Sequence, residues 1–90
     1  MYYVYVLFSN KDRKLYIGFT PNLKNRMKAH EGGFVKATKN RRPFTLIYHE
    51  SYLEESDAKQ REKYLKGGNG HKDLKIQLVE CFKKLKYKFS

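Results

Sequence analysis

The sequence predicts an α/β fold of the α+β type, with a small, mostly antiparallel three-stranded sheet flanked by helices. Three β-favouring segments and three segments of helical periodicity follow one another in the order β-β-α-β-α-α. At 90 residues the chain has room for one hydrophobic core, so we expect residues 1–90 to form a single domain. A core of this size offers no deep enclosed pocket. A functional site should therefore lie in a shallow groove on the surface.

The N-terminal segment predicts a β-hairpin. Residues 2–8 are β-branched, aromatic or leucine, which is typical of a strand. Residues 9–13 are polar and turn-forming, and residues 15–19 provide the return strand. Because side chains alternate along a strand, Tyr3 and Tyr5 share one face of the first strand.

A helix is predicted from about residue 22 to residue 30. Residues 20–22 contain an N-cap candidate and a proline that fits the start of a helix, and a glycine pair at 32–33 ends it. Arg26 and His30 are four residues apart, so two basic side chains share one face of this helix.

A basic segment follows this helix. Residues 34–43 have few apolar positions and predict a surface loop. Four cations in the loop are candidates for contacts with phosphate groups: Lys36, Lys39, Arg41 and Arg42.

The rest of the chain predicts one strand and two helices. Residues 44–48 are apolar and β-favouring, and a helix should run from about residue 56 to residue 66, where Gly67 and Gly68 end it. A last helix from about residue 71 to residue 87 places an apolar stripe on one side, formed by Leu74, Leu78, Phe82 and Leu85.

The charge balance points to a polyanionic partner. Twenty Lys and Arg against nine Asp and Glu give a formal net charge of +11, which favours nucleic acid over a membrane surface. No stretch approaches the roughly 18 apolar residues of a membrane span. The single cysteine, Cys81, cannot form an internal disulfide, and we expect it to be an inert packing residue. These observations predict a cytoplasmic protein.

Glu62 stands out in the helix predicted at residues 56–66. It lies four residues after Ala58 and three before Leu65, and therefore on the apolar stripe of that helix. Burial of an unpaired carboxylate is costly. Glu62 is therefore ion-paired with one of the many lysines, bound to a metal ion, or at the edge of the core, and the sequence leaves these three open. Zinc is not indicated, since His49 and His71 lack partners at metal-ligand spacing.

These residues, in this order, resemble the GIY-YIG nuclease family. The match consists of Tyr3-Val4-Tyr5, then Tyr16-Ile17-Gly18, then Arg26 and His30, then Glu62. It covers about residues 2–70 and is most similar to the small stand-alone bacterial members, and to the nuclease domain of the eukaryotic endonuclease that trims branched DNA. The first tripeptide departs from Gly-Ile-Tyr but keeps its tyrosine. Asn69 is only a loose candidate for the late asparagine of many members.

The resemblance implies hydrolysis of phosphodiester bonds with one divalent ion, Mg²⁺ or Mn²⁺. Glu62 would hold the ion, and Arg26 would clamp the scissile phosphate. Tyr5 or Tyr16 would be the general base, and the sequence does not say which. His30 would orient a tyrosine or the water, or relay a proton.

The implied substrate is DNA in preference to RNA, recognised by its structure rather than its base sequence, in DNA repair or recombination. Two other interpretations remain: a non-catalytic nucleic-acid-binding module, and a scaffold or ribosome-associated protein. Glu62 favours the enzyme, because a pure phosphate binder gains nothing from a carboxylate near its anion. The need for a protein partner and the formation of a homodimer both stay open.

Overall fold

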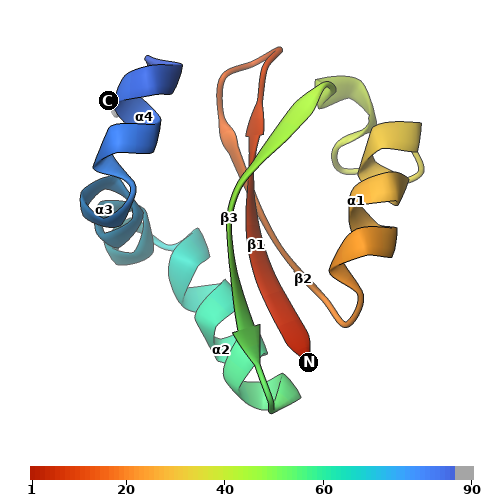
Figure 1. Cartoon of the computed structure of the whole chain (residues 1–90), viewed down its shortest axis with the longest axis vertical. Helices are drawn as coiled ribbons and strands as arrows, with labels where there is room; N and C mark the ends of the chain where they lie inside the picture. The colour runs from red at the N-terminus through yellow and green to blue at the C-terminus, as the bar shows by residue number, and fades with distance from the viewer. Residues whose placement is uncertain (87–90) are drawn as a thin grey trace.

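The computed structural model describes residues 1–86, which form a three-stranded antiparallel sheet with helices packed on it (Figure 1). The central strand is β1 (Tyr2–Ser9), with β2 (Leu15–Thr20) on one side and β3 (Phe44–Tyr52) on the other. Both pairings are antiparallel. The predicted α+β class and its three-stranded sheet are confirmed.

The helices lie on both sides of the sheet (Figure 1). One side carries α1 (Leu23–Gly32), and the other carries α2 (Glu55–Lys66), α3 (Gly68–Gln77) and α4 (Val79–Leu85). A short 3₁₀ helix, η1 (Lys39–Arg41), lies in the connection between α1 and β3. Within residues 1–86, no helix has the length and apolar character needed to cross a membrane.

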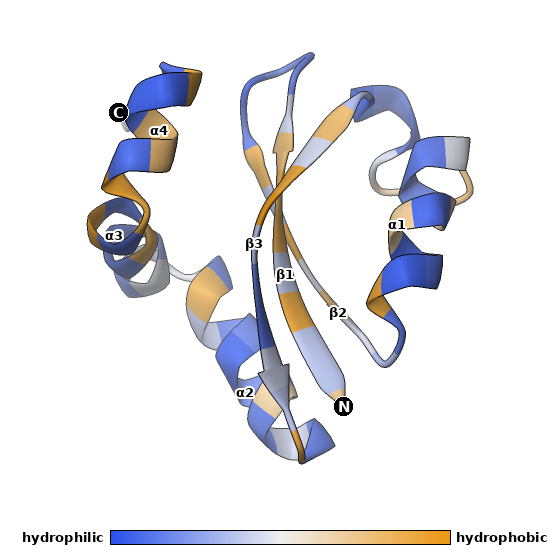
Figure 2. Cartoon of the chain, viewed as in Figure 1, coloured by the Kyte–Doolittle hydropathy of each residue, from blue (hydrophilic) through white to orange (hydrophobic). Residues whose placement is uncertain are grey.

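The hydrophobic core fills the space between the sheet and the three C-terminal helices. Its buried members are Val4, Val6, Ile17, Ala58, Leu65, Leu74 and Phe82. Figure 2 shows apolar residues along the strands, and hydrophilic ones over the hairpin turn and much of α1. Because side chains alternate along β1, Tyr5 points to the face opposite Val4 and Val6, toward α1.

The ends of α1 follow from two residues. The Asn22 side chain accepts a hydrogen bond of 3.0 Å from the Asn25 backbone N–H, which caps the N-terminus. Gly33 adopts φ 78°, and its N–H donates to the carbonyls of Ala29 and His30, which ends the helix. The sequence predicted both ends to within two residues.

The C-terminal region differs from the prediction in two ways. β3 continues to Tyr52 instead of ending at residue 48. The single helix predicted from residue 71 is two helices separated at Leu78, whose backbone (φ −113°, ψ 31°) is not helical, and the first of them begins at Gly68. The break lets the buried Leu74 and Phe82 reach the same core. The predicted end at residue 87 lies outside the described residues.

The predicted surface loop at residues 34–43 is more ordered than expected. It contains η1 and two buried side chains, Val35 and Thr38, which are 8% and 0% exposed. The prediction of a plain surface loop was therefore wrong for part of the segment. The physical reason is that the segment returns beneath the C-terminal end of α1, where Thr38 contacts His30.

Candidate active site

Tyr5 is fixed against a glycine of the neighbouring strand. Tyr5 of β1 is directly opposite Gly18 of β2 in the antiparallel register, and its side chain is 0% exposed. A Cβ at position 18 would collide with Cζ and Oη of the phenol. Steric exclusion thus explains why the Tyr16-Ile17-Gly18 motif ends in glycine, since only a residue without a side chain lets the phenol of Tyr5 lie across β2.

The Tyr5 hydroxyl lies between two side chains of α1. Its oxygen is 2.8 Å from Nε2 of His30, and Arg26 Nε donates to it over 3.4 Å. The other ring nitrogen of His30, Nδ1, is 2.7 Å from the Thr38 hydroxyl. His30 and Thr38 are both buried, so this chain of contacts runs from the half-buried Arg26 into the protein.

Tyr16 completes the cluster from β2. Its ring centroid is 5.4 Å from that of His30 and 6.3 Å from that of Tyr5. Unlike Tyr5, it is only half-buried. The structure thus brings together four of the residues singled out from the sequence, which come from three elements: Tyr5, Tyr16, Arg26 and His30.

Burial and charge fix the protonation of this cluster. Burial, helped by the positive charge of Arg26, lowers the pKa of His30 to about 4, so the imidazole is neutral at neutral pH. Burial raises the pKa of Tyr5, although the hydrogen bond from Arg26 acts in the opposite direction. The pKa of Arg26 is raised, chiefly by its hydrogen bond to Tyr5 and further by Tyr16.

Glu62 lies at the edge of the core. Its neighbours Ala58 and Leu65 on α2 are fully buried, whereas the Glu62 side chain is 22% exposed. Its carboxylate pairs with Nζ of Lys66 over 3.0 Å, one turn along the helix. Its negative charge is a minor cause of the raised pKa of Tyr5, after burial, which places it within electrostatic range of the cluster.

The residues present can hold a magnesium ion through a single carboxylate, with waters and substrate phosphates as its other ligands. Among residues 1–86, no group of three or more His, Cys, Asp and Glu side chains could enclose a metal. Mg²⁺ usually keeps several waters and takes one or two carboxylates together with substrate phosphates. Glu62 offers one partly exposed carboxylate, and its partner Lys66 is 57% exposed and can turn away.

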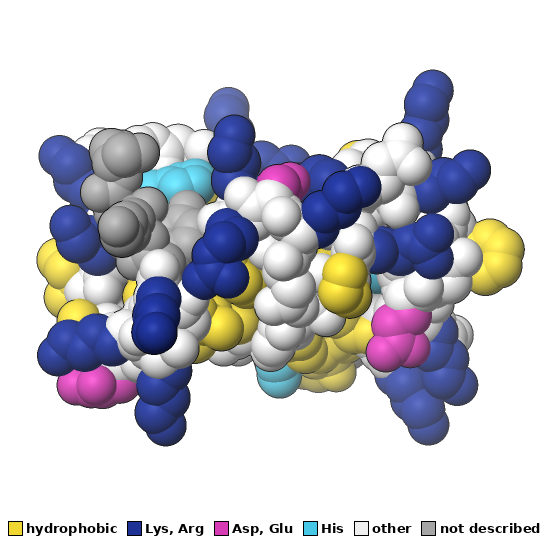
Figure 3. Space-filling model, turned by 90° about the horizontal axis from the view of Figure 1, so that it is seen from above, with side chains coloured by type: hydrophobic (Ala, Val, Ile, Leu, Met, Phe, Trp, Pro, Cys, Tyr) yellow, Lys and Arg dark blue, Asp and Glu magenta, His cyan; other side chains and the backbone are white. Residues whose placement is uncertain are grey.

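The four cations of the basic loop divide into two kinds. Arg41 pairs with Asp12 of the hairpin turn over 2.5 Å, and Arg42 donates to the Glu31 carbonyl over 3.0 Å. Both arginines therefore hold the loop in place. Lys36 and Lys39 are exposed, and no described side chain pairs with their ammonium groups. Figure 3 shows that Lys and Arg side chains are spread over the whole of the visible face rather than gathered in one patch.

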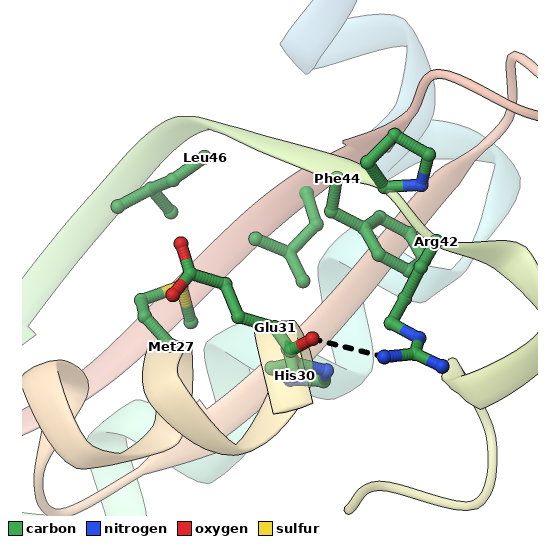
Figure 4. Close-up of a pocket in the computed structure, with 8 residues that line it drawn as sticks. Met27, His30, Glu31, Arg42, Phe44 and Leu46 are labelled. Carbon is green, nitrogen blue, oxygen red and sulfur yellow. Dashed lines mark hydrogen bonds between the residues drawn. The ribbon is translucent and has the colours of Figure 1, made fainter. Parts of the chain in front are cut away.

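A separate pocket of about 430 Å³ lies between α1 and β3 (Figure 4). Its lining is largely apolar and includes Met27, Phe44 and Leu46. Of the candidate catalytic residues only His30 contributes to it, and Tyr16, Arg26 and Glu62 do not. Tyr16 and Arg26 of the candidate site thus lie outside this pocket, and both side chains are only half-buried.

Thr38 was missed by sequence reasoning, because a threonine in a basic loop carries no signal until the loop is seen to fold back on His30. Asn69 is exposed in the first turn of α3, and among the described residues no hydrogen bond joins it to the tyrosine cluster.

Comparison with known proteins identifies the family to which this chain belongs. The family model of the GIY-YIG catalytic domain matches residues 1–75. A UPF0213 protein of Clostridium perfringens is 41% identical over 80 residues, which cover 88% of this chain and 83% of the relative. A UPF0213 protein of Staphylococcus haemolyticus is 38% identical, covering 83% and 92%. The solution structure of a UPF0213 protein of Bacillus halodurans superposes with a TM-score of 0.51 at 31% identity, covering 82% of both chains.

Proposed function

This chain belongs to the GIY-YIG family, and from that premise we propose that it is a magnesium-dependent endonuclease that hydrolyses phosphodiester bonds in DNA. The observation that supports this best is the placement of Tyr16 and Arg26, two accessible groups, beside a buried Tyr5–His30 pair that holds Arg26. This arrangement offers a phosphate-binding cation and a proton acceptor next to each other, and both remain partly accessible to solvent.

We assign the general base to Tyr16 rather than Tyr5. The Tyr5 hydroxyl is buried and already bonded to His30 and Arg26, and its raised pKa disfavours the phenolate. Tyr16 is half-buried and interacts with the positive charge of Arg26. As phenolate it would take a proton from water while the water oxygen bonds to phosphorus. The bond from phosphorus to the leaving oxygen then breaks, and that oxygen ends protonated from solvent.

Arg26 is proposed to clamp the scissile phosphate. Its Nε is used by Tyr5, which leaves the two terminal nitrogens of the guanidinium for phosphate oxygens. A guanidinium held in this way offsets the negative charge that grows on those oxygens in the transition state. Because His30 is buried and neutral, we assign it to holding Tyr5 and not to proton transfer.

Glu62 is proposed to hold Mg²⁺ or Mn²⁺. Ion pairs four residues apart on the surface of a helix contribute only about 0.3–0.5 kcal/mol, and because the Lys66 end of this pair is 57% exposed, water can solvate the ammonium when it is released. Once bound, the ion would act as a Lewis acid on the phosphate oxygens.

For the substrate we propose DNA recognised by its backbone shape, such as branched, flapped or single-stranded DNA, in repair or recombination. The small surface leaves little room for base contacts. Lys36 and Lys39 supply free charge for phosphate contacts, and Arg41 and Arg42 support the loop that carries them.

The ion pair between Glu62 and Lys66 favours a second candidate, because a carboxylate that is already paired with a lysine needs no metal ion. This candidate is a module that binds nucleic acid without cutting it. The deciding experiment measures cleavage of labelled duplex, single-stranded and branched DNA with Mg²⁺ or Mn²⁺, and binding in the same samples. Wild type should cut, whereas Arg26→Ala and Tyr16→Phe should fold and bind but cut at least about a hundredfold more slowly. Wild type that binds all three substrates and cuts none would support the second candidate.

A further inference from the structure

The hydrogen bonds around Tyr5 form a chain whose direction can be worked out by counting protons. Arg26 Nε donates to the Tyr5 oxygen, which is 2.8 Å from His30 Nε2, while His30 Nδ1 is 2.7 Å from the Thr38 oxygen. The Thr38 hydroxyl also lies 3.5 Å from the carbonyl of Val35. All buried side-chain nitrogens and oxygens among the described residues have a partner. Because a buried donor without an acceptor is costly, we expect the chain to provide an acceptor for each of its protons.

A neutral imidazole carries one proton, on either Nδ1 or Nε2. If Nε2 carried it, His30 would donate to Tyr5, and the proton of the buried Tyr5 hydroxyl would have no acceptor among residues 1–86. If Nδ1 carries it, His30 donates to Thr38, Thr38 donates to Val35, and Tyr5 donates to Nε2. Only the second arrangement pairs every donor, because an unpaired buried donor is costly.

We propose that Thr38 is a positioning residue for the active site: its hydroxyl accepts the proton of His30 Nδ1 and so leaves Nε2 free to accept from Tyr5. The oxygen of Tyr5 then turns a lone pair toward Arg26 Nε, which orients the guanidinium for phosphate. This role rests on the proposed function for its effect on cleavage, but the state of the imidazole does not depend on any activity.

The position of Thr38 suits this role. Its side chain is 0% exposed, and it reaches His30 from the loop rather than from the same helix. Valine has nearly the same shape and lacks only the hydroxyl, so Thr38→Val removes the acceptor and preserves the packing. Without the acceptor, either imidazole form leaves one donor unpaired, and the preference for the proton on Nδ1 is lost.

The first test uses nuclear magnetic resonance of ¹⁵N-labelled protein at pH 7 without substrate. Long-range ¹H–¹⁵N spectra show which ring nitrogen carries the proton, and the His30→Gln variant identifies the His30 signals among the three histidines. We expect a protonated Nδ1 in the wild type and in Thr38→Ser, and both forms in Thr38→Val. A wild type with its proton on Nε2, or a charged imidazole, overturns the proposal even if Thr38→Val fails to fold.

The second test measures cleavage under single turnover. Thr38→Val should lower the rate constant about tenfold at saturating DNA with little change in DNA affinity, and Thr38→Ser should restore it. Thr45→Val removes the hydroxyl of an exposed threonine on β3 and serves as the matched control, with an unchanged rate. An unchanged rate in Thr38→Val overturns the proposal. A wild type without cleavage contradicts the proposed nuclease, while the imidazole measurement still decides the hydrogen-bond chain.

Discussion

Replacement of Gly18 by alanine should destabilise this protein by about 2–6 kcal/mol, the sum of an overpacked core site and weakened buried hydrogen bonds. The new Cβ would overlap Cζ and Oη of Tyr5. The Tyr5 side chain cannot move aside without loss of contacts, because its ring is fully buried and its hydroxyl is hydrogen-bonded to His30 and Arg26.

The magnitude follows from what must move. Forcing an extra carbon into a packed site costs about 1–3 kcal/mol. Displacement of the phenol also stretches its bond to His30, and an unsatisfied buried polar group costs about 1–3 kcal/mol. For a domain of this size, each kcal/mol lowers the melting temperature by about 4–8 °C. The variant should therefore melt at least about 8 °C below the wild type.

Urea denaturation of Gly18→Ala and of a matched control, Gly68→Ala, tests this reasoning. A Cβ at position 68 meets no heavy atom within 4 Å, so this variant should be neutral or slightly stabilising. Adding Tyr5→Ala, which removes the obstructing ring, should recover most of the cost of Gly18→Ala in a double-mutant cycle. The reasoning is refuted if Gly18→Ala and Gly68→Ala unfold at the same urea concentration.

Three further predictions follow from other contacts. Glu50→Ala should lower the free energy of unfolding by about 2–3 kcal/mol, because Arg61 Nε, which lies 3.0 Å from the partly buried Glu50 carboxylate, would lose its partner. Chemical denaturation measures this loss, and a value below about 0.5 kcal/mol contradicts the prediction. The pKa of His30 falls from 6.5 in the unfolded chain to about 4, so its contribution to stability is complete above pH 6.5 and disappears as the pH falls toward 4. Wild type should lose stability over that interval and His30→Gln should lose less; equal losses in thermal unfolding would argue against a buried neutral His30. The double variant Lys36→Gln, Lys39→Gln should weaken binding to all DNA sequences. The magnitude of the slope of log affinity against log salt should fall by about 0.9 per lost phosphate contact on duplex DNA, and an unchanged slope would show that the loop is not part of the binding surface.

The sequence predicts the arrangement of the site through local patterns. Alternation along β1 and the spacing of Arg26 and His30 on α1 are properties of neighbouring residues, and both survive in the structure. The pairing of Tyr5 with Gly18 follows from the hairpin, in which the register depends on a short turn. Four of the five candidate catalytic residues meet for these reasons, and Glu62 lies on the apolar stripe where its spacing placed it.

What the sequence did not predict depends on contacts between distant segments. Thr38 becomes buried because the loop folds back on α1, and no local pattern marks that return. Arg41 looked like a free cation, but Asp12 of the hairpin turn neutralises it from 29 residues away. The break at Leu78 falls inside an apolar stripe of helical spacing, because packing of both sides against one core outweighs continuation of the helix.

The most direct test of the central claim is a titration of Mg²⁺ against cleavage of a branched DNA, with binding followed in the same samples. Wild type should cut in proportion to bound metal and stop when a chelator is added. Glu62→Gln should bind the DNA but cut at least about a hundredfold more slowly at all metal concentrations, while Glu80→Gln, which changes an exposed carboxylate of α4, should match the wild type. Cleavage by Glu62→Gln at the wild-type rate, or cleavage that persists without any divalent ion, would contradict the claim.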